Sequence, residues 1–180
     1  SQTEGRELPR LGMDELTGEV AGYDATIGAL KEMSPVPVRF EAPDTNAKGC
    51  YNRAEDYIAV RPDLSQVQTI KTLIHEIAHA KLHKVITDDT GRTKPRPERE
   101  VEAESVAYVV CQYLGVDTSD YTFGYIAGWS KKRELPELKS ALDTIRKAAA
   151  ELIDGLEERE IVPQKTALPQ PKKYDRAPVR

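Results

Sequence analysis

The sequence IKTLIHEIAHAKLH at residues 70–83 contains an H-E-x-x-H motif and decides the fold of the chain. On a helix of about 3.6 residues per turn, His75 and His79 lie on one face, where two imidazoles can bind one metal ion. Glu76 lies beside them and can act as a base on a water at the metal. Two histidines at this spacing can also meet by accident on a helix surface. The intervening glutamate, and the presence of all three histidines of the chain in this stretch, favour the metal site.

The residues around the motif predict a helix. Apolar residues recur at helical spacing across residues 67–78, with neither Gly nor Pro before Lys84. Ser65 is a candidate N-cap, and Gln68 can complete a capping box three residues later. A β-hairpin is predicted just before it, from strands at residues 49–52 and 57–61. A strand that leads into such a helix either offers its edge to an extended peptide or simply covers the core.

Two histidines leave a hydrolytic zinc site one protein ligand short, because such sites usually have three. His83 continues the same helical face, but it lies two turns from His75. That separation is about 12 Å along a straight helix, so three imidazoles of one helix cannot converge on one ion. We therefore interpret His83 as a residue that supports a ligand, lines the pocket or caps the helix.

A second helix, predicted at about residues 98–114, carries the carboxylates that can complete the site. Glu100 and Glu104 share one face with small residues, which lets the two helices approach closely. Buried carboxylates need a cation or a hydrogen-bond donor. We predict Glu100 as the third ligand and Glu104 as the carboxylate that orients a ligand histidine, with Glu104 as the main rival for the ligand position. Glu102 is expected to point away from this face, toward water or the opposite side.

These residues resemble a known family. His75-Glu76-x-x-His79 followed by Glu100-x-x-Ala103-Glu104-x-x-Ala107 is similar to the gluzincin-type metallopeptidases of the ImmA/IrrE group. It is also similar to the metallopeptidase domain of ArdC-type antirestriction proteins. The resemblance covers roughly residues 47–130, and Glu104 stands where many members carry Asn or Asp. It implies an α+β, zincin-like fold, in which a small antiparallel sheet packs on the H-E-x-x-H helix and further helices. Such domains occur on conjugative elements and phages, which implies repressor cleavage or a role against restriction.

The remaining elements follow from periodicity and turn residues. A helix is predicted at residues 13–33, a strand at 37–41, an exposed loop at 87–99 and an aromatic segment at 121–129 behind a cap cluster at 118–120. A long helix begins near Pro136. The apolar stripe of this helix consists of Leu138, Leu142, Ile145, Ala149, Leu152, Ile153 and Leu156.

The composition indicates one domain with polar ends, because 39% of the 180 residues are hydrophobic and 31% are charged. Residues 1–12 are predicted as a flexible N-terminus, 13–160 as the zincin-like domain and 161–180 as a disordered, proline-rich basic tail. The net charge of −4, with mixed signs, gives no indication of a general nucleic-acid binder. Contact with nucleic acid is expected only through the basic tail or a missing neighbouring domain.

Cysteine usage and hydropathy narrow the class further. Cys50 and Cys111 are isolated, so neither a disulfide framework nor a cysteine zinc site is indicated. There is no signal-peptide core and no apolar run of about 18 residues, so we expect a cytoplasmic protein without membrane contact. The sequence begins at Ser1 rather than Met, so a processed chain or a piece of a longer protein is expected.

The combined prediction is a peptidase with one Zn²⁺ per chain and Glu76 as the catalytic base. The expected substrate is a protein or peptide, with a transcriptional repressor as one candidate. Candidate donors to the oxyanion are His83, Tyr51 and the tyrosines of residues 121–125, including Tyr125. The alternative is a non-catalytic domain that holds zinc and regulates by contact with DNA or a partner protein. Glu76 favours catalysis, because a purely structural zinc site does not need it.

Overall fold

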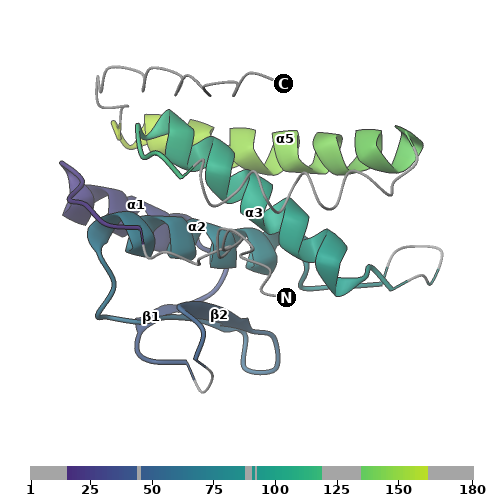
Figure 1. Cartoon of the computed structure of the whole chain (residues 1–180), viewed down its shortest axis with the longest axis horizontal. Helices are drawn as coiled ribbons and strands as arrows, with labels where there is room; N and C mark the ends of the chain where they lie inside the picture. The colour runs from purple at the N-terminus through teal and green to yellow at the C-terminus, as the bar shows by residue number, and fades with distance from the viewer. Residues whose placement is uncertain (1–15, 44–45, 88–90, 92, 119–134, 162–180) are drawn as a thin grey trace, which may run out of the picture.

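The structure is a computed structural model, and it describes residues 16–43, 46–87, 91, 93–118 and 135–161. The described part confirms the α+β class (Figure 1). Its elements are α1 (Tyr23–Met33), β1 (Val38–Phe40), β2 (Gly49–Asn52), β3 (Tyr57–Val60), α2 (Gln66–Leu82), α3 (Arg96–Tyr113) and α5 (Leu135–Glu158). The predicted tail from residue 162, the aromatic segment and Tyr125 lie outside the described residues. The domain limits therefore stay predictions.

The sheet has three strands in the order β1-β3-β2. The predicted hairpin is confirmed, because β2 runs antiparallel to β3 with Cys50 opposite Ala59. The sheet as a whole is mixed rather than antiparallel, since β1 runs parallel to β3 with Val38 opposite Ile58. The strand that leads into α2 is β3, which is central and paired on both sides. On the hairpin side, the outer strand of the described sheet is therefore β2 and not the strand that leads into α2.

Helix α2 is the centre of the packing. In Figure 1 the sheet lies on one side of α2 and α5 on the other, and α3 crosses between α2 and α5. Helix α2 contacts both the sheet and α3. Its apolar residues Ile70, Leu73, Ile74 and Ile77 are fully buried, and each buried side chain of this size contributes roughly 1.5–3 kcal/mol to folding.

The N-cap of α2 forms as predicted. The side chain of Ser65 accepts a hydrogen bond from the backbone N–H of Gln68 at 3.2 Å. The reciprocal half of the capping box is wrong, because the side-chain oxygen of Gln68 accepts from the backbone N–H of Leu16 and from Lys48 Nζ instead. The start of α2 is thus tied to the chain that precedes α1.

The first predicted helix is too long. Helix α1 begins at Tyr23, because Gly22 adopts a left-handed φ of 71° at the N-cap position. The residues before Gly22 form no helix from Leu16 onward, and the backbone N–H of Val20 donates to Gln66 Oε1 at 2.7 Å. This segment is therefore held by contacts with the start of α2 and is not helical, although its apolar spacing predicted a helix.

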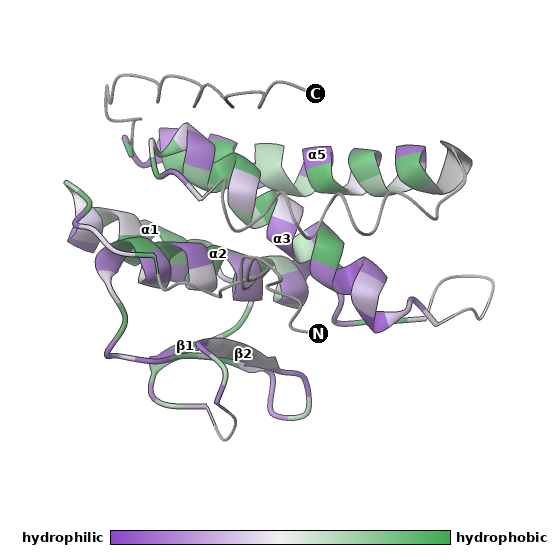
Figure 2. Ribbon diagram, in the orientation of Figure 1, coloured by the Kyte–Doolittle hydropathy of each residue, from purple (hydrophilic) through white to green (hydrophobic). Residues whose placement is uncertain are grey.

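Helix α5 presents an apolar stripe to the core, as predicted, except at Leu142. Figure 2 shows hydrophobic and hydrophilic residues alternating along this helix. The side chains of Ile145, Ala149, Leu152 and Leu156 are buried, but Leu142 is 63% exposed. Ala141 takes the buried position at that end of the stripe.

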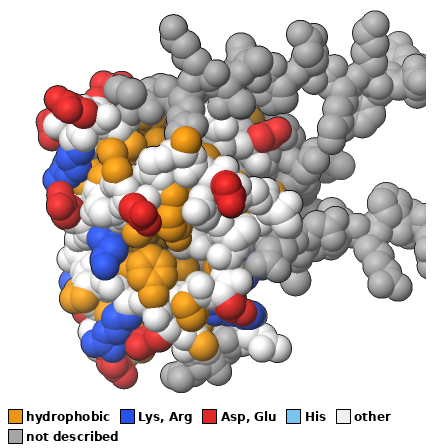
Figure 3. All heavy atoms as spheres, turned by 90° about the vertical axis from the view of Figure 1, so that its left-hand side faces the viewer, with side chains coloured by type: hydrophobic (Ala, Val, Ile, Leu, Met, Phe, Trp, Pro, Cys, Tyr) orange, Lys and Arg blue, Asp and Glu red, His pale blue; other side chains and the backbone are white. Residues whose placement is uncertain are grey.

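The surface is mixed in character. On the face shown in Figure 3, acidic and basic side chains lie among apolar ones. Among the helices that the structure describes, none combines the length and the hydropathy needed to cross a lipid bilayer.

Candidate metal centre

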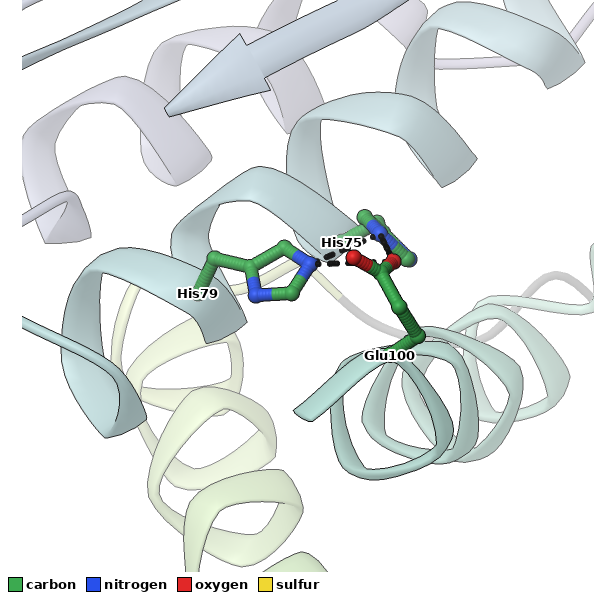
Figure 4. A group of neighbouring side chains, drawn as sticks. All are labelled: His75, His79 and Glu100. Atoms are coloured by element: carbon green, nitrogen blue, oxygen red, sulfur yellow. Dashed lines mark hydrogen bonds and ion pairs between the residues drawn. The ribbon is translucent and has the colours of Figure 1, made fainter. Parts of the chain in front are cut away.

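Three predicted ligands meet where α2 and α3 cross (Figure 4). The Nε2 atoms of His75 and His79 are 3.1 Å apart. Glu100 Oε2 lies 3.5 Å from His75 Nε2 and 3.4 Å from His79 Nε2. These three ligand atoms therefore form a nearly equilateral triangle, and the group could hold a metal ion.

The triangle fits a zinc ion. Zinc takes imidazole nitrogens and carboxylate oxygens at about 2.0–2.2 Å in tetrahedral geometry, which puts neighbouring ligand atoms about 3.4 Å apart. Glu100 also has the charge state that a ligand needs, because its contacts with His75 and His79 hold the pKa of its carboxyl far below the usual value. Two imidazoles and one carboxylate leave the fourth position of a zinc site open.

The small residues between the helices set this geometry. Ala78 of α2 and Ala103 and Ala107 of α3 are completely buried. Side chains of this size allow the two helix backbones to approach closely, so that Glu100 reaches across to both histidines. Helix α3 thus covers the face of α2 that carries His75 and His79.

A buried ion pair lies behind His75. Glu104 Oε2 is 3.3 Å from His75 Nδ1, and Lys71 Nζ lies 3.0 Å from the same carboxylate. The side chains of Lys71 and Glu104 are only 6% and 4% exposed. Burial favours the neutral acid, but contacts with His75 and Lys71 outweigh it and lower the pKa of Glu104 to about 2. We call Lys71, Glu104 and His75 the inner network.

A second chain of polar groups lies behind His79. His79 Nδ1 is 2.9 Å from His83 Nδ1, and His83 Nε2 is 2.8 Å from Glu102 Oε2. Lys94 Nζ donates to both oxygens of Glu102 at 2.8 Å. His83 itself is the C-cap residue of α2 and only 2% exposed. We call His79, His83, Glu102 and Lys94 the outer network.

The tautomers of the outer network are consistent with a metal at His79. If His79 Nε2 is a ligand, its Nδ1 carries the proton and donates to His83 Nδ1. His83 then carries its proton on Nε2 and donates to the carboxylate of Glu102. Every buried nitrogen of the two rings is thereby satisfied.

Of the two directions expected for Glu102, water or the opposite side, the structure excludes water. Glu102 does point away from the face of Glu100, but it is only 1% exposed. On this side Thr87 pairs with Thr93, and the Lys94 N–H donates to the Ile86 carbonyl at 2.7 Å. These contacts hold Lys94 against Glu102, whose carboxylate is thereby shielded from water.

Glu76 lies beside the triangle and against the sheet. It is 7% exposed, and burial raises the pKa of its carboxyl above the usual value. The backbone N–H of Tyr51 in β2 donates to this carboxylate. A carboxylate with a raised pKa next to a metal site suits a general base near neutral pH.

Among the described strands, none pairs with the outer edge of β2, and residues of β2 line the site. In an antiparallel pair, hydrogen-bonded and non-hydrogen-bonded residue pairs alternate. Arg61 N–H donates to the Lys48 carbonyl, so Gly49 and Tyr51 direct their backbone groups away from β3. A Cβ at Gly49 would lie 2.5 Å from a methyl carbon of Thr72 and 3.2 Å from Glu76 Cγ. Only glycine therefore allows β2 to lie this close to α2.

A pocket of about 560 Å³ opens over the triangle. Its lining consists of Ala47, Gly49, Cys50, Tyr51, Arg53, His75, Glu76, His79, His83, Arg96, Arg99 and Glu100. The Tyr51 hydroxyl donates to Asp56 Oδ1 at 2.8 Å, and burial together with this hydrogen bond raises its pKa to about 12. The hydroxyl is thus engaged by Asp56 in this structure.

Sequence analysis missed five charged residues around the site: Lys71, Lys94, Arg53, Arg96 and Arg99. Two signals were available. Lys71 precedes His75 by four residues, so it extends the ligand face by one turn. Arg96 precedes Glu100 by four residues and therefore shares its face. For Lys94 and Arg53 the sequence offers no comparable signal, because both lie outside the helices and strands.

Comparison with known proteins matches part of the chain to a family model. Residues 36–112 match the family model Peptidase_M78, described as the IrrE N-terminal-like domain, which confirms the resemblance to the ImmA/IrrE group over this metallopeptidase-like segment. An uncharacterized protein of Bacillus anthracis is 27% identical over 164 residues. That alignment covers 87% of this chain but only 26% of the relative, so the chain spans about a quarter of that protein's length. No solved structure matches significantly.

Proposed function

We propose that the IrrE N-terminal-like domain of this chain is a zinc-dependent peptidase that hydrolyses a protein or peptide. In this proposal His75, His79 and Glu100 hold one Zn²⁺ per chain. The observation that supports it best is the triangle of three ligand atoms, with Glu76 and an open pocket beside it. A closed structural site would have a fourth protein ligand instead of an open side.

The proposed mechanism assigns one task to each group. When bound, zinc would supply Lewis acidity, which polarises the scissile carbonyl and lowers the pKa of a water. Glu76 accepts the proton of the attacking water and later delivers it to the leaving amine. Glu104 and His83 keep the two imidazoles in the tautomer and orientation that ligands require.

The substrate is proposed to bind as an extended strand. Gly49 and Tyr51 line the pocket, and their backbone groups point away from β3. The Tyr51 N–H is engaged by Glu76, so the Gly49 groups and the Tyr51 carbonyl would pair with the substrate, and such pairing is a common way to bind peptides. Residues of an unfolded or loop segment fit this geometry, whereas a folded helix does not.

The biological role that we propose follows the family resemblance: cleavage of a transcriptional repressor or action against restriction on a mobile element. A repressor substrate would place the activity in the cytoplasm. The rival proposal is a regulatory domain that holds zinc without catalysis and acts by contact with DNA or a partner protein. The presence of Glu76 at the site favours the peptidase.

The test uses Glu76→Gln, because an amide cannot take up the proton. We expect this variant to bind zinc like the wild type and to lose cleavage by about 10²–10⁴-fold. Candidate repressors encoded near the gene would be incubated with the zinc-loaded protein and their fragments identified by mass spectrometry. Glu55→Gln, at an exposed position of the β2–β3 turn, is the matched control.

Two results would contradict the peptidase proposal. One is cleavage by Glu76→Gln at the wild-type rate. The other is a zinc-loaded wild type that binds its repressor stably without cutting it, which would support the rival.

A further inference from the structure

Three arginines line the pocket over the metal centre: Arg53, Arg96 and Arg99. Arg96 and Arg99 stand one turn apart in the first turns of α3, on the face that also carries Glu100. Arg53 belongs to the turn between β2 and β3. Arginines therefore enter the pocket from both the helical side and the sheet side.

Among the described residues, these arginines have few partners. The Nε atom of Arg99 is buried, yet it has no hydrogen-bond partner among the described residues. A buried donor without a partner carries a desolvation cost. Arg96 reaches Glu100 only at 3.5 Å, and its side chain is 81% exposed. Within the described part of the chain, no ion pair joins Arg53 to an acidic residue.

The charge of the lining is unbalanced. Its acidic members are Glu76 and Glu100, and both belong to the proposed metal centre. Zinc offsets their two charges, which leaves the three guanidinium groups in excess. The planar guanidinium fork matches a carboxylate and can bind it with two parallel hydrogen bonds.

We propose that Arg99 and Arg53 form a subsite for a carboxylate of the substrate, next to the scissile bond. This inference rests on the proposed peptidase function and names its substrate class: peptides with an Asp or Glu side chain, or a free C-terminal carboxylate, beside the bond that is cut. Arg99 lines this subsite from the helical side, and Arg53 closes it from the sheet side.

The test uses four ligands that bind the metal in the same way. Each is a succinyl hydroxamate, coupled to Asp-amide, Asn-amide, Leu-amide or Leu with a free carboxylate. Affinities for the zinc-loaded protein are measured by calorimetry. If the carboxylate belongs to a side chain, Asp-amide should bind roughly 10- to 100-fold tighter than Asn-amide, as for a hydrogen-bonded charged group. If it is the C-terminus, the free Leu ligand should exceed Leu-amide by the same factor.

Variants of the two arginines test whether the preference for a carboxylate ligand over an amide ligand depends on the subsite. Arg99→Gln and Arg53→Gln should reduce the preference for the carboxylate ligand at least several-fold while leaving the amide ligands unchanged. Arg99→Lys, which keeps the charge but loses the fork, should be intermediate. The matched control is Arg146→Gln, since Arg146 is 70% exposed on α5 and does not line the pocket. Should Arg99→Gln fail to fold, Arg53→Gln at its exposed turn decides.

The outcomes separate this inference from the function on which it rests. Equal affinity of acid and amide in both ligand pairs, with all four bound, overturns the carboxylate subsite and leaves the peptidase intact. A preference that both arginine variants retain also overturns it. Failure of every hydroxamate to bind the zinc-loaded protein overturns the metal centre and the subsite together.

Discussion

The inner and outer networks each support one imidazole of the candidate metal centre, but they differ in composition and exposure. Each ends in a carboxylate and a lysine behind one imidazole of the candidate metal centre. In the inner network Lys71 and Glu104 come from α2 and α3, and their side chains are 6% and 4% exposed. In the outer network Lys94 comes from the segment between these helices, its side chain is 32% exposed, and His83 stands between the carboxylate and His79.

Because the two networks differ in exposure, their loss should affect the stability of the fold and the orientation of the ligand histidines to different degrees. The inner network is enclosed by two helices, so its charges cannot be hydrated if one partner is lost. The outer network reaches the surface through Lys94, where water can replace a missing group. We therefore expect inner changes to affect both folding and metal binding, and outer changes to decline in effect along the chain from His83 to Lys94.

The largest effect is expected for Glu104→Ala. It leaves Lys71 buried without its carboxylate and His75 without its orienting partner, so the free energy of unfolding should fall by about 3–5 kcal/mol. Zinc affinity should fall by about 10- to 100-fold. Urea denaturation of the metal-free protein and chelator competition measure the two quantities.

A double variant separates the two effects. In Lys71→Met with Glu104→Leu, both charges are gone, so most of the stability should return while zinc affinity stays low. A single variant that loses less than about 1 kcal/mol would mean that Lys71 reaches water and that the inner network is not enclosed.

The next prediction concerns pH, where the two networks differ in sign. Burial opposes the charge on His75, but hydrogen bonds to Glu100 and Glu104 outweigh it and raise its pKa from 6.5 to about 9. A raised pKa stabilises the fold below the unfolded value and loses this contribution as the pH rises through the folded value. Burial lowers the pKa of His83, with Glu102 opposing, so the outer network loses stability only as the pH falls below 6.5.

For the metal-free protein, the free energy of unfolding should therefore decrease between pH 6.5 and about 9. The loss amounts to at most about 3–4 kcal/mol, from the usual conversion of a pKa shift. With zinc bound the decrease should vanish, because a ligand imidazole is already deprotonated. Urea titrations across this range, with and without zinc, would show it; a decrease that zinc does not alter would contradict the placement of His75.

This contrast also explains how far the sequence could predict the site. The spacing of His75, His79 and His83 and the pair Glu100 and Glu104 belong to two regular helices, where sequence distance fixes direction. The burial of Glu102 was not predicted, because helical spacing tells which way a side chain points but not what covers it. Lys94, which covers it, is held by a backbone hydrogen bond to Ile86 outside the two helices, and such a contact leaves only a weak signal in the sequence.

The same limit applies to the fold. The helix α2, the hairpin and the core stripe of α5 follow from periodicity. The apolar positions before Gly22 had helical spacing too, but a left-handed glycine and the side chain of Gln66 fix that segment otherwise. Leu142 shows that a stripe predicts a face and not the burial of each member.

A smaller effect is expected for Glu102→Ala. His83 loses the acceptor for its Nε2 proton and becomes a buried donor without a partner, which costs about 1–3 kcal/mol. Zinc affinity should fall by about 10-fold, the lower end of the range for groups behind a ligand, because one imidazole intervenes. Glu102→Gln keeps an acceptor oxygen and should recover most of both losses. An unchanged zinc affinity in Glu102→Ala would show that His79 is oriented without the outer network.

The smallest effect is expected for Lys94→Met, at the end of the outer network. Lys94 is 32% exposed, so water can take over its hydrogen bonds to Glu102, and the loss should stay below about 1 kcal/mol. The matched variant is Lys71→Met, which makes the same change where water cannot follow and should cost about 3 kcal/mol or more. Chemical denaturation of both variants compares the two lysines directly. Equal losses would mean that Lys94 is as enclosed as Lys71, and the distinction between the networks would then rest on His83 alone.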